Sequence, residues 1–107
     1  MIALSVKVRP TEPGHALTLF GRSLRRFRHL TARDGNVMVH VTSIGQVLLT
    51  ESSDQTQLDM VAPNETVAAT MVEVVSRELA LATPGRAVDR SFRVEWDRPT
   101  IIPAPLR

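Results

Sequence analysis

The stretch "GRSLRRFRHL", residues 21–30, holds four arginines and a histidine and no acidic residue. Arginine presents a planar guanidinium with five N–H donors, which suits bidentate contact with phosphate or carboxylate groups. We therefore define a candidate anion-binding patch as Arg22, Arg25, Arg26, Arg28 and His29. Its residue types predict binding of a polyanion such as nucleic acid, with an affinity that falls steeply as salt rises.

The distribution of charge supports this patch. The net charge of the chain is only +2, from 13 basic and 11 acidic residues. Residues 15–33 hold five of the basic residues, Arg33 being the fifth, and none of the acidic ones. All of the excess positive charge therefore lies in one segment.

The same segment has the periodicity of an amphipathic helix from about residue 14 to residue 29. Its apolar residues recur three and four positions apart: Leu17, Phe20, Leu24 and Phe27. Arginines in the last turns of a helix are favoured by the helix dipole, whatever they bind. A solvated helix end is therefore the alternative to a working anion site, and the sequence leaves both open.

His29 and His40 support a second hypothesis, a small-ligand or iron-related accessory protein whose ligand these two side chains contact. The chain has three histidines and no cysteine, so thiolate zinc sites and cysteine-ligated iron–sulfur clusters are excluded. His15 and His29 lie at opposite ends of the expected helix, about 20 Å apart at ~1.5 Å per residue, and do not share an ion. We predict no metal and no cofactor.

No catalytic motif is present. No serine stands in a G-x-S-x-G elbow, and the five glycines form neither a G-x-x-x-x-G-K nor a G-x-G-x-x-G phosphate loop. Glu95 and Asp97 share a face of one expected strand, but Arg93 and Arg98 flank them. That arrangement favours salt bridges over general acid–base catalysis. We expect a binding or accessory protein and no enzyme.

Hydrophobic alternation predicts five strands. They are residues 2–8 and the runs "NVMVHV", "GQVLLTE", "TQLDMVA" and "SFRVEWD". The short links "TSIG" and "SSDQ" predict an antiparallel meander. A second helix is expected in "PNETVAATMVEVVSRELALA", with Asn64 as its N-cap. The order β-α-β-β-β-α-β predicts an α+β two-layer sandwich, a mainly antiparallel sheet with two helices on one face.

The length of 107 residues predicts one domain over residues 1–98, followed by an extended proline-rich tail over residues 99–107. The helix-free sheet face is expected to be polar, and edge strands make a homodimer a further expectation. No targeting segment and no run of ~20 apolar residues is apparent, so we expect a cytoplasmic protein with no membrane partner.

The layout also resembles a prokaryotic family known as domain of unknown function 2218, over residues 3–98. The anchors are "ARDGNVMVHVTSIGQVLLTE", "MVEVVSREL" and the closing "SFRVEWDRP". The resemblance implies a bacterial α+β domain with a link to iron acquisition, because such domains occur beside siderophore-reducing flavoproteins. The family often carries cysteine and paired histidines near the end of its first helix. This chain has only His29 there, so the resemblance transfers no ligand to that position.

Overall fold

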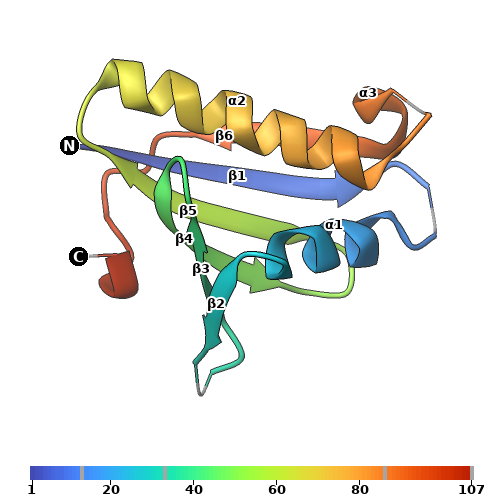
Figure 1. The fold of residues 1–107 in the computed structure, drawn as a ribbon, viewed down its shortest axis with the longest axis horizontal. Helices are drawn as coiled ribbons and strands as arrows, with labels where there is room; N and C mark the ends of the chain where they lie inside the picture. Colours follow the sequence, from blue (N-terminus) through green and yellow to red (C-terminus); the bar gives the residue numbers. More distant parts are fainter. Residues whose placement is uncertain (13, 33, 86, 107) are drawn as a thin grey trace.

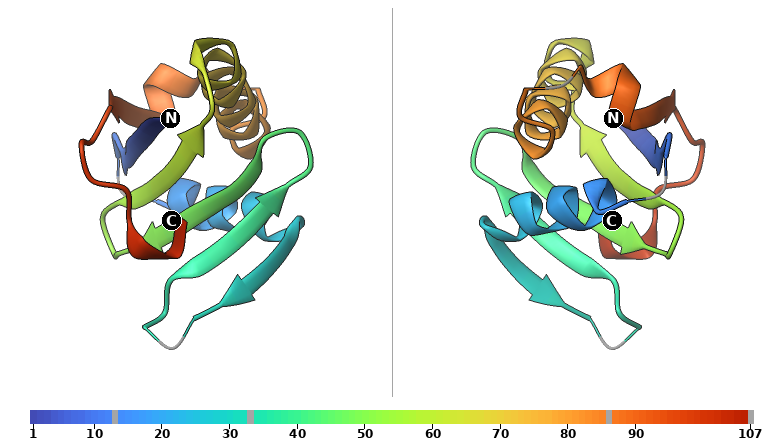
Figure 2. Two further views of the ribbon diagram at one scale, coloured as in Figure 1. Left: turned by 90° about the vertical axis from the view of Figure 1, so that its left-hand side faces the viewer. Right: turned by 90° about the vertical axis from the view of Figure 1, so that its right-hand side faces the viewer.

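The structure is a computed structural model that describes residues 1–12, 14–32, 34–85 and 87–106. The elements in chain order are β1 (Ile2–Pro10), α1 (Ala16–Arg25), β2 (Arg28–Thr31), β3 (Val37–Val41), β4 (Gly45–Glu51), β5 (Thr56–Ala62), α2 (Glu65–Ala82), α3 (Val88–Ser91), β6 (Phe92–Asp97) and the 3-10 helix η1 (Ala104–Leu106). The strands form one antiparallel sheet in the order β2-β3-β4-β5-β1-β6 (Figure 1). With α1 and α2 packed on one face, the expected α+β two-layer sandwich is confirmed (Figure 2).

The register of the sheet separates an apolar face from a polar one. Val6 of β1 pairs with Leu58 of β5 and with Trp96 of β6, and side chains directly opposite each other share a face. This face points to the helices and forms the core together with Phe20 of α1 and Met71 of α2. The helix-free face carries the polar residues that the alternation predicted there: Lys7, His40, Thr50, Asp59, Arg93 and Glu95.

Helix α2 begins where its sequence predicts. The Oδ1 atom of Asn64 accepts a hydrogen bond of 2.9 Å from the backbone N–H of Val67, which satisfies one of the free donors of the first turn. The helix ends before Gly85, whose φ of 79° is a backbone conformation that glycine adopts without steric strain.

The first helix is shorter than its apolar periodicity predicts. It ends at Arg25, and residues 28–31 form β2, which was not expected. The chain turns where the N–H of Phe27 bonds the carbonyl of Leu24, and β2 then pairs with β3. This pairing satisfies backbone groups of β3 that an edge position would leave open. The sheet therefore has two edges, β2 and β6, and the expected homodimer stays a prediction.

The C-terminal tail is not wholly extended. Residues Ala104–Leu106 form η1, which lies against β4 on the side of the sheet opposite α1 and α2 (Figure 2). Leu48 on this helix-free face is only 7% exposed. Among the described residues, no helix combines the length and apolar character needed to cross a membrane.

Candidate functional site

The predicted anion-binding patch is divided between two elements. Arg22 and Arg25 lie on α1, and Arg26 is the C-cap residue of that helix. Arg28 and His29 lie on β2. The prediction that all five lie on one helix was wrong, because the chain leaves the helix after Arg25. Arg33, the fifth arginine of the basic segment, lies outside the described residues.

Arg26 is held by a buried carboxylate. Glu78 of α2 is 4% exposed, and its Oε1 accepts a 2.5 Å hydrogen bond from Nη2 of Arg26. Its Oε2 accepts a second hydrogen bond, of 3.0 Å, from the hydroxyl of Ser23. The guanidinium carbon of Arg26 also lies 4.8 Å from the centroid of the Phe27 ring, within cation–π range. Arg26 is thus anchored on one side, while its side chain remains 53% exposed.

Arg25 has a comparable anchor in the sheet. Its Nη2 donates a hydrogen bond to Oε1 of Glu51, the last residue of β4. This hydrogen bond, helped by the charge of Glu51, raises the pKa of Arg25, against the opposing effect of desolvation. A Cβ atom built on Gly21 would lie 2.6 Å from Oε2 of Glu51. Glycine at that position therefore leaves room for the ion pair to lie over the backbone of α1.

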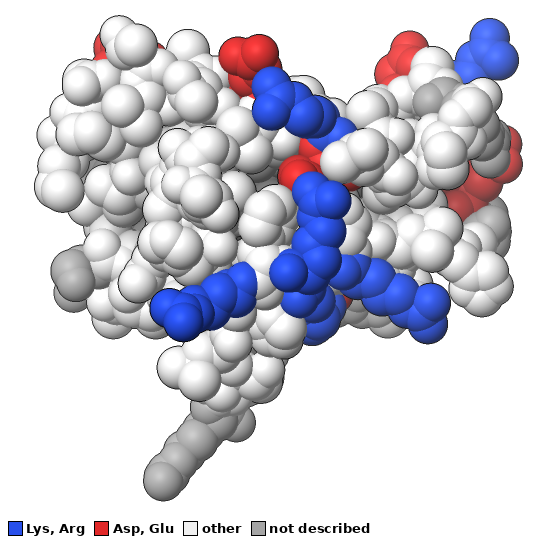
Figure 3. Space-filling view, viewed as in Figure 1, with Lys and Arg blue, Asp and Glu red and all other residues white. Residues whose placement is uncertain are grey.

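Arg22 and Arg28 differ from these two, because neither has an acidic partner among the described residues. Both side chains are exposed. Basic side chains gather around the C-terminal end of α1, with acidic side chains between and beside them (Figure 3). The arrangement combines two anchored guanidinium groups with two free ones.

The two candidate histidines occupy strand positions that face opposite sides of the sheet, although both residues line one open hollow beside β2 and β3. In the register of β2 and β3, Arg28 is opposite His40, whereas His29 is opposite Val39. Consecutive residues of a strand point to opposite faces, so His29 and His40 lie on opposite sides of the sheet. Nδ1 of His29 lies 3.0 Å from the carbonyl oxygen of Phe27. Within the described ranges, no three histidine, aspartate or glutamate side chains gather closely enough to hold a metal ion.

Comparison with known proteins adds no assignment: no family model, no curated protein and no solved structure matches the chain. The resemblance to domain of unknown function 2218 therefore stays a prediction, as does the link to iron acquisition that it implies.

The two carboxylates that hold the arginines were not predicted from the sequence. Glu78 could have been found, because it lies seven residues after Met71 and next to Leu79, within the buried stripe of α2. A carboxylate in a buried stripe requires a donor or a cation nearby. Glu51 offers no such signal, because its side chain is partly exposed at the end of a strand.

Proposed function

We propose that this protein is a non-enzymatic module that binds a polyanion along an arginine surface formed by Arg22, Arg25, Arg26 and Arg28. The observation that carries the proposal is the anchoring of two of these arginines. Glu51 and Glu78 hold Arg25 and Arg26, while 37% and 53% of the two side chains stay exposed. An arginine fixed in this way presents its remaining N–H donors in a set direction.

Anchoring favours binding for an entropic reason. A free arginine loses much of its rotamer freedom when it contacts a phosphate, by an amount of about 0.5–1.5 kcal/mol for each immobilised side chain. Arg25 and Arg26 have lost part of that freedom already in the folded protein. Each guanidinium has five N–H donors, so one hydrogen bond to a carboxylate leaves others for a ligand.

The two carboxylates also limit the affinity. Four arginines and two glutamates leave this surface with a net charge of +2. Strong nonspecific attraction of a polyanion to this surface is therefore not expected. Phe27, the aromatic residue nearest the arginines, is half-buried beneath Arg26 and offers no open face on which a base could stack. Contacts to the phosphate backbone, without preference for base sequence, are therefore the mode of binding that we propose.

The pairing of β2 with β3 places Arg28 so that the arginine surface continues around the β2 edge. Arg28 shares a face with His40, on the opposite side of the sheet from α1. A flexible strand of nucleic acid could contact Arg22 on the helix side and Arg28 across the edge. Single substitutions of these two residues distinguish a ligand that stays on one side from a ligand that crosses the edge.

The test measures fluorescence anisotropy of labelled single-stranded DNA, RNA and heparin over a series of salt concentrations. We compare the wild type with Arg22→Ala/Arg28→Ala, because these two residues have no acidic partner whose loss would disturb folding. Each phosphate contact removed should lower the slope of log affinity against log salt by about 1, so the double variant should lose about 2.

The matched control is Lys7→Ala/Arg93→Ala, which removes the same charge from the helix-free face near β1 and β6. Its affinity and salt slope should equal those of the wild type. Equal weakening of the two double variants would show that net charge, and not this surface, attracts the ligand. Absence of binding at the lowest salt would overturn the proposed function.

A further inference from the structure

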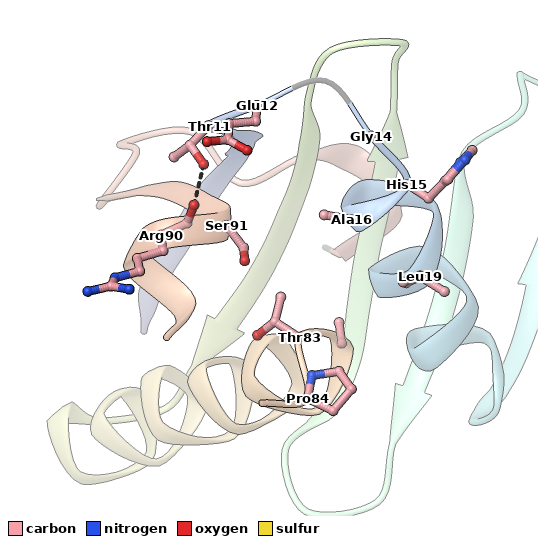
Figure 4. A pocket seen from close by; sticks show the side chains of 11 residues that line it. Thr11, Glu12, Gly14, His15, Ala16, Leu19, Thr83, Pro84, Arg90 and Ser91 are labelled. Atoms are coloured by element: carbon pink, nitrogen blue, oxygen red, sulfur yellow. Dashed lines mark hydrogen bonds between the residues drawn. The ribbon is translucent and has the colours of Figure 1, made fainter. Parts of the chain in front are cut away.

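A cavity lies at the other end of α1 from the arginine surface. Its volume is about 280 Å³, and it opens to solvent between the segment after β1, the first turn of α1, the C-terminal end of α2 and α3 (Figure 4). This volume is at the small end of the range for ligand pockets, which is roughly 300–1,000 Å³. The residues that line it differ entirely from the arginine surface, so the inference below is independent of the proposed function.

Ser91 directs into the cavity a hydroxyl group that has no hydrogen-bond partner among the described residues. The residue is only 8% exposed, and its hydroxyl has no hydrogen bond to any described residue. No polar side-chain atom of the described residues is sealed from solvent without a partner, so the oxygen of Ser91 is open to the cavity. Figure 4 shows this hydroxyl directed into the cavity on the side of Thr83. A nearly buried hydroxyl of this kind can bond directly to a ligand that enters, in exchange for its contact with water.

The first turn of α1 provides further donors. No side chain caps this helix, and its first turn holds no acidic residue. The backbone N–H groups of Ala16, Leu17 and Thr18 have no backbone acceptor among the described residues, and of these three residues Ala16 lines the cavity. Such groups carry the positive end of the helix dipole and favour an anion. The imidazole of His15 and the guanidinium of Arg90 point away from the cavity (Figure 4), so backbone groups and Ser91 are its donors.

The facing side of the cavity provides acceptors. Ala82 and Thr83 at the end of α2 line it, and the last turn of α2 holds no basic residue. The carbonyl end of a helix carries the negative end of the dipole and favours a cation. The hydroxyl of Thr83 donates to the carbonyl oxygen of Leu79 at 3.1 Å, so its oxygen can accept from a ligand. Glu12 adds a carboxylate that has no ion-pair partner among the described residues.

We propose that this cavity binds a small zwitterion with one carboxylate and one ammonium group, of which a free α-amino acid with a short side chain is the simplest. The carboxylate would accept hydrogen bonds from the first turn of α1 and from Ser91. The ammonium would face Glu12, which lies on the other side of Ser91 from the end of α2 (Figure 4). An anion alone would be repelled by Glu12, and a cation alone would be repelled by the N-terminus of α1, so a ligand with both charges fits best.

The test is a titration of the ¹⁵N-labelled protein with L-alanine at neutral pH, followed by NMR and by calorimetry. Acetate and methylammonium serve as probes of the two halves of the ligand. We expect L-alanine to shift the amide signals of Ala16, Thr83 and Ser91, and to bind about tenfold more tightly than either half, since one added charge-assisted contact contributes about 1.4 kcal/mol or more.

Two variants examine the two sides of the cavity separately. Ser91→Ala should weaken L-alanine binding about tenfold or more, as expected for one lost hydrogen bond to a charged group. Ser76→Ala, which changes an exposed serine of α2 outside the cavity, should leave the affinity unchanged. Glu12→Gln changes an exposed residue without threatening the fold, and it should lower the affinity for L-alanine to that for acetate.

Acetate binding as tightly as L-alanine would replace the zwitterion with a simple anion and overturn the proposal. So would shifts confined to residues outside the cavity, or no shifts at the highest concentration of L-alanine. If Ser91→Ala alters the spectrum of the free protein throughout, the result with Glu12→Gln decides the question.

Discussion

Substitution of Arg26 tests whether the buried carboxylate of Glu78 depends on its arginine. In Arg26→Ala, Glu78, which is 4% exposed in the wild type, keeps only the hydroxyl of Ser23 as a donor. Loss of one partner of a fully buried ion pair destabilises a protein by about 3–5 kcal/mol. The exposed side of Arg26 lets water reach the carboxylate, so the loss should be smaller. We expect a decrease of about 2–3 kcal/mol in the free energy of unfolding, which includes the hydrogen bond and the contact with Phe27.

The assay is urea unfolding followed by the fluorescence of Trp96, the single tryptophan of the chain. Its side chain packs against the core from β6, so its emission should report global unfolding. At the thermal midpoint, the same loss should lower Tm by about 8–15 °C in a domain of this size. The matched control is Arg28→Ala, which removes an exposed arginine without an acidic partner and should change the stability by less than about 0.5 kcal/mol.

A second substitution distinguishes the cost of leaving Glu78 charged without a partner from the cost of losing its contact with Arg26. In the Arg26→Ala background, Glu78→Gln removes the charge that has lost its partner and keeps the size of the side chain. We expect this change to restore about 1 kcal/mol or more, although in the wild type the same change should destabilise the protein. Equal stability of Arg26→Ala and Arg28→Ala would refute the reasoning, because it would show that Glu78 does not need Arg26.

Three further changes test other contacts. Asn64→Ala removes the N-cap of α2 and should lower the free energy of unfolding by about 1 kcal/mol, whereas Asn64→Asp should retain most of it in the same urea assay. Arg98 hydrogen-bonds Glu65 and lowers its pKa, so this pair stabilises the fold above the unfolded-state pKa of Glu65 and ceases to do so as pH falls through the folded-state value. In Arg98→Ala the pKa of Glu65, followed by NMR, should rise toward its ordinary value, and an unchanged pKa would mean that the pair does not form in solution. A chain that ends at Thr100 lacks η1, which lies against β4, and should lose about 1–3 kcal/mol, whereas unchanged stability would show that the tail does not pack on the sheet.

The sheet was largely predictable because its inner strands alternate strongly. Residues 2–8 fall within β1, and Val6 and Val8 are fully buried, as their spacing indicates. The meander was predictable from short links between apolar runs. Strand β2 was not predictable by the same means, because all four of its residues are exposed and its backbone pairing decides its conformation. Phe27, three residues beyond Leu24, continued the helical spacing past the true end of α1.

The candidate sites were less predictable than the fold. Composition located the arginines, but their partners Glu51 and Glu78 lie 26 and 52 residues further along the chain from Arg25 and Arg26. The cavity beside Ser91 is formed by four segments of the chain. The sequence around Ser91 does not indicate that its hydroxyl lacks a partner in the protein. Such sites depend on the packing of distant elements, which periodicity in a single sequence does not specify.

The position of β1 has a consequence for the synthesis of the chain. This strand precedes the other five along the chain, yet it lies inside the sheet between β5 and β6. One edge of β1 therefore lacks a partner until Phe92–Asp97 have been synthesised, and its apolar side chains and free backbone groups remain available to other chains. Exposed strand edges of this kind promote aggregation of incomplete chains. A ribosome that stalls before β6 would release an aggregation-prone fragment, so the solubility of the newly made chain depends on the synthesis of β6.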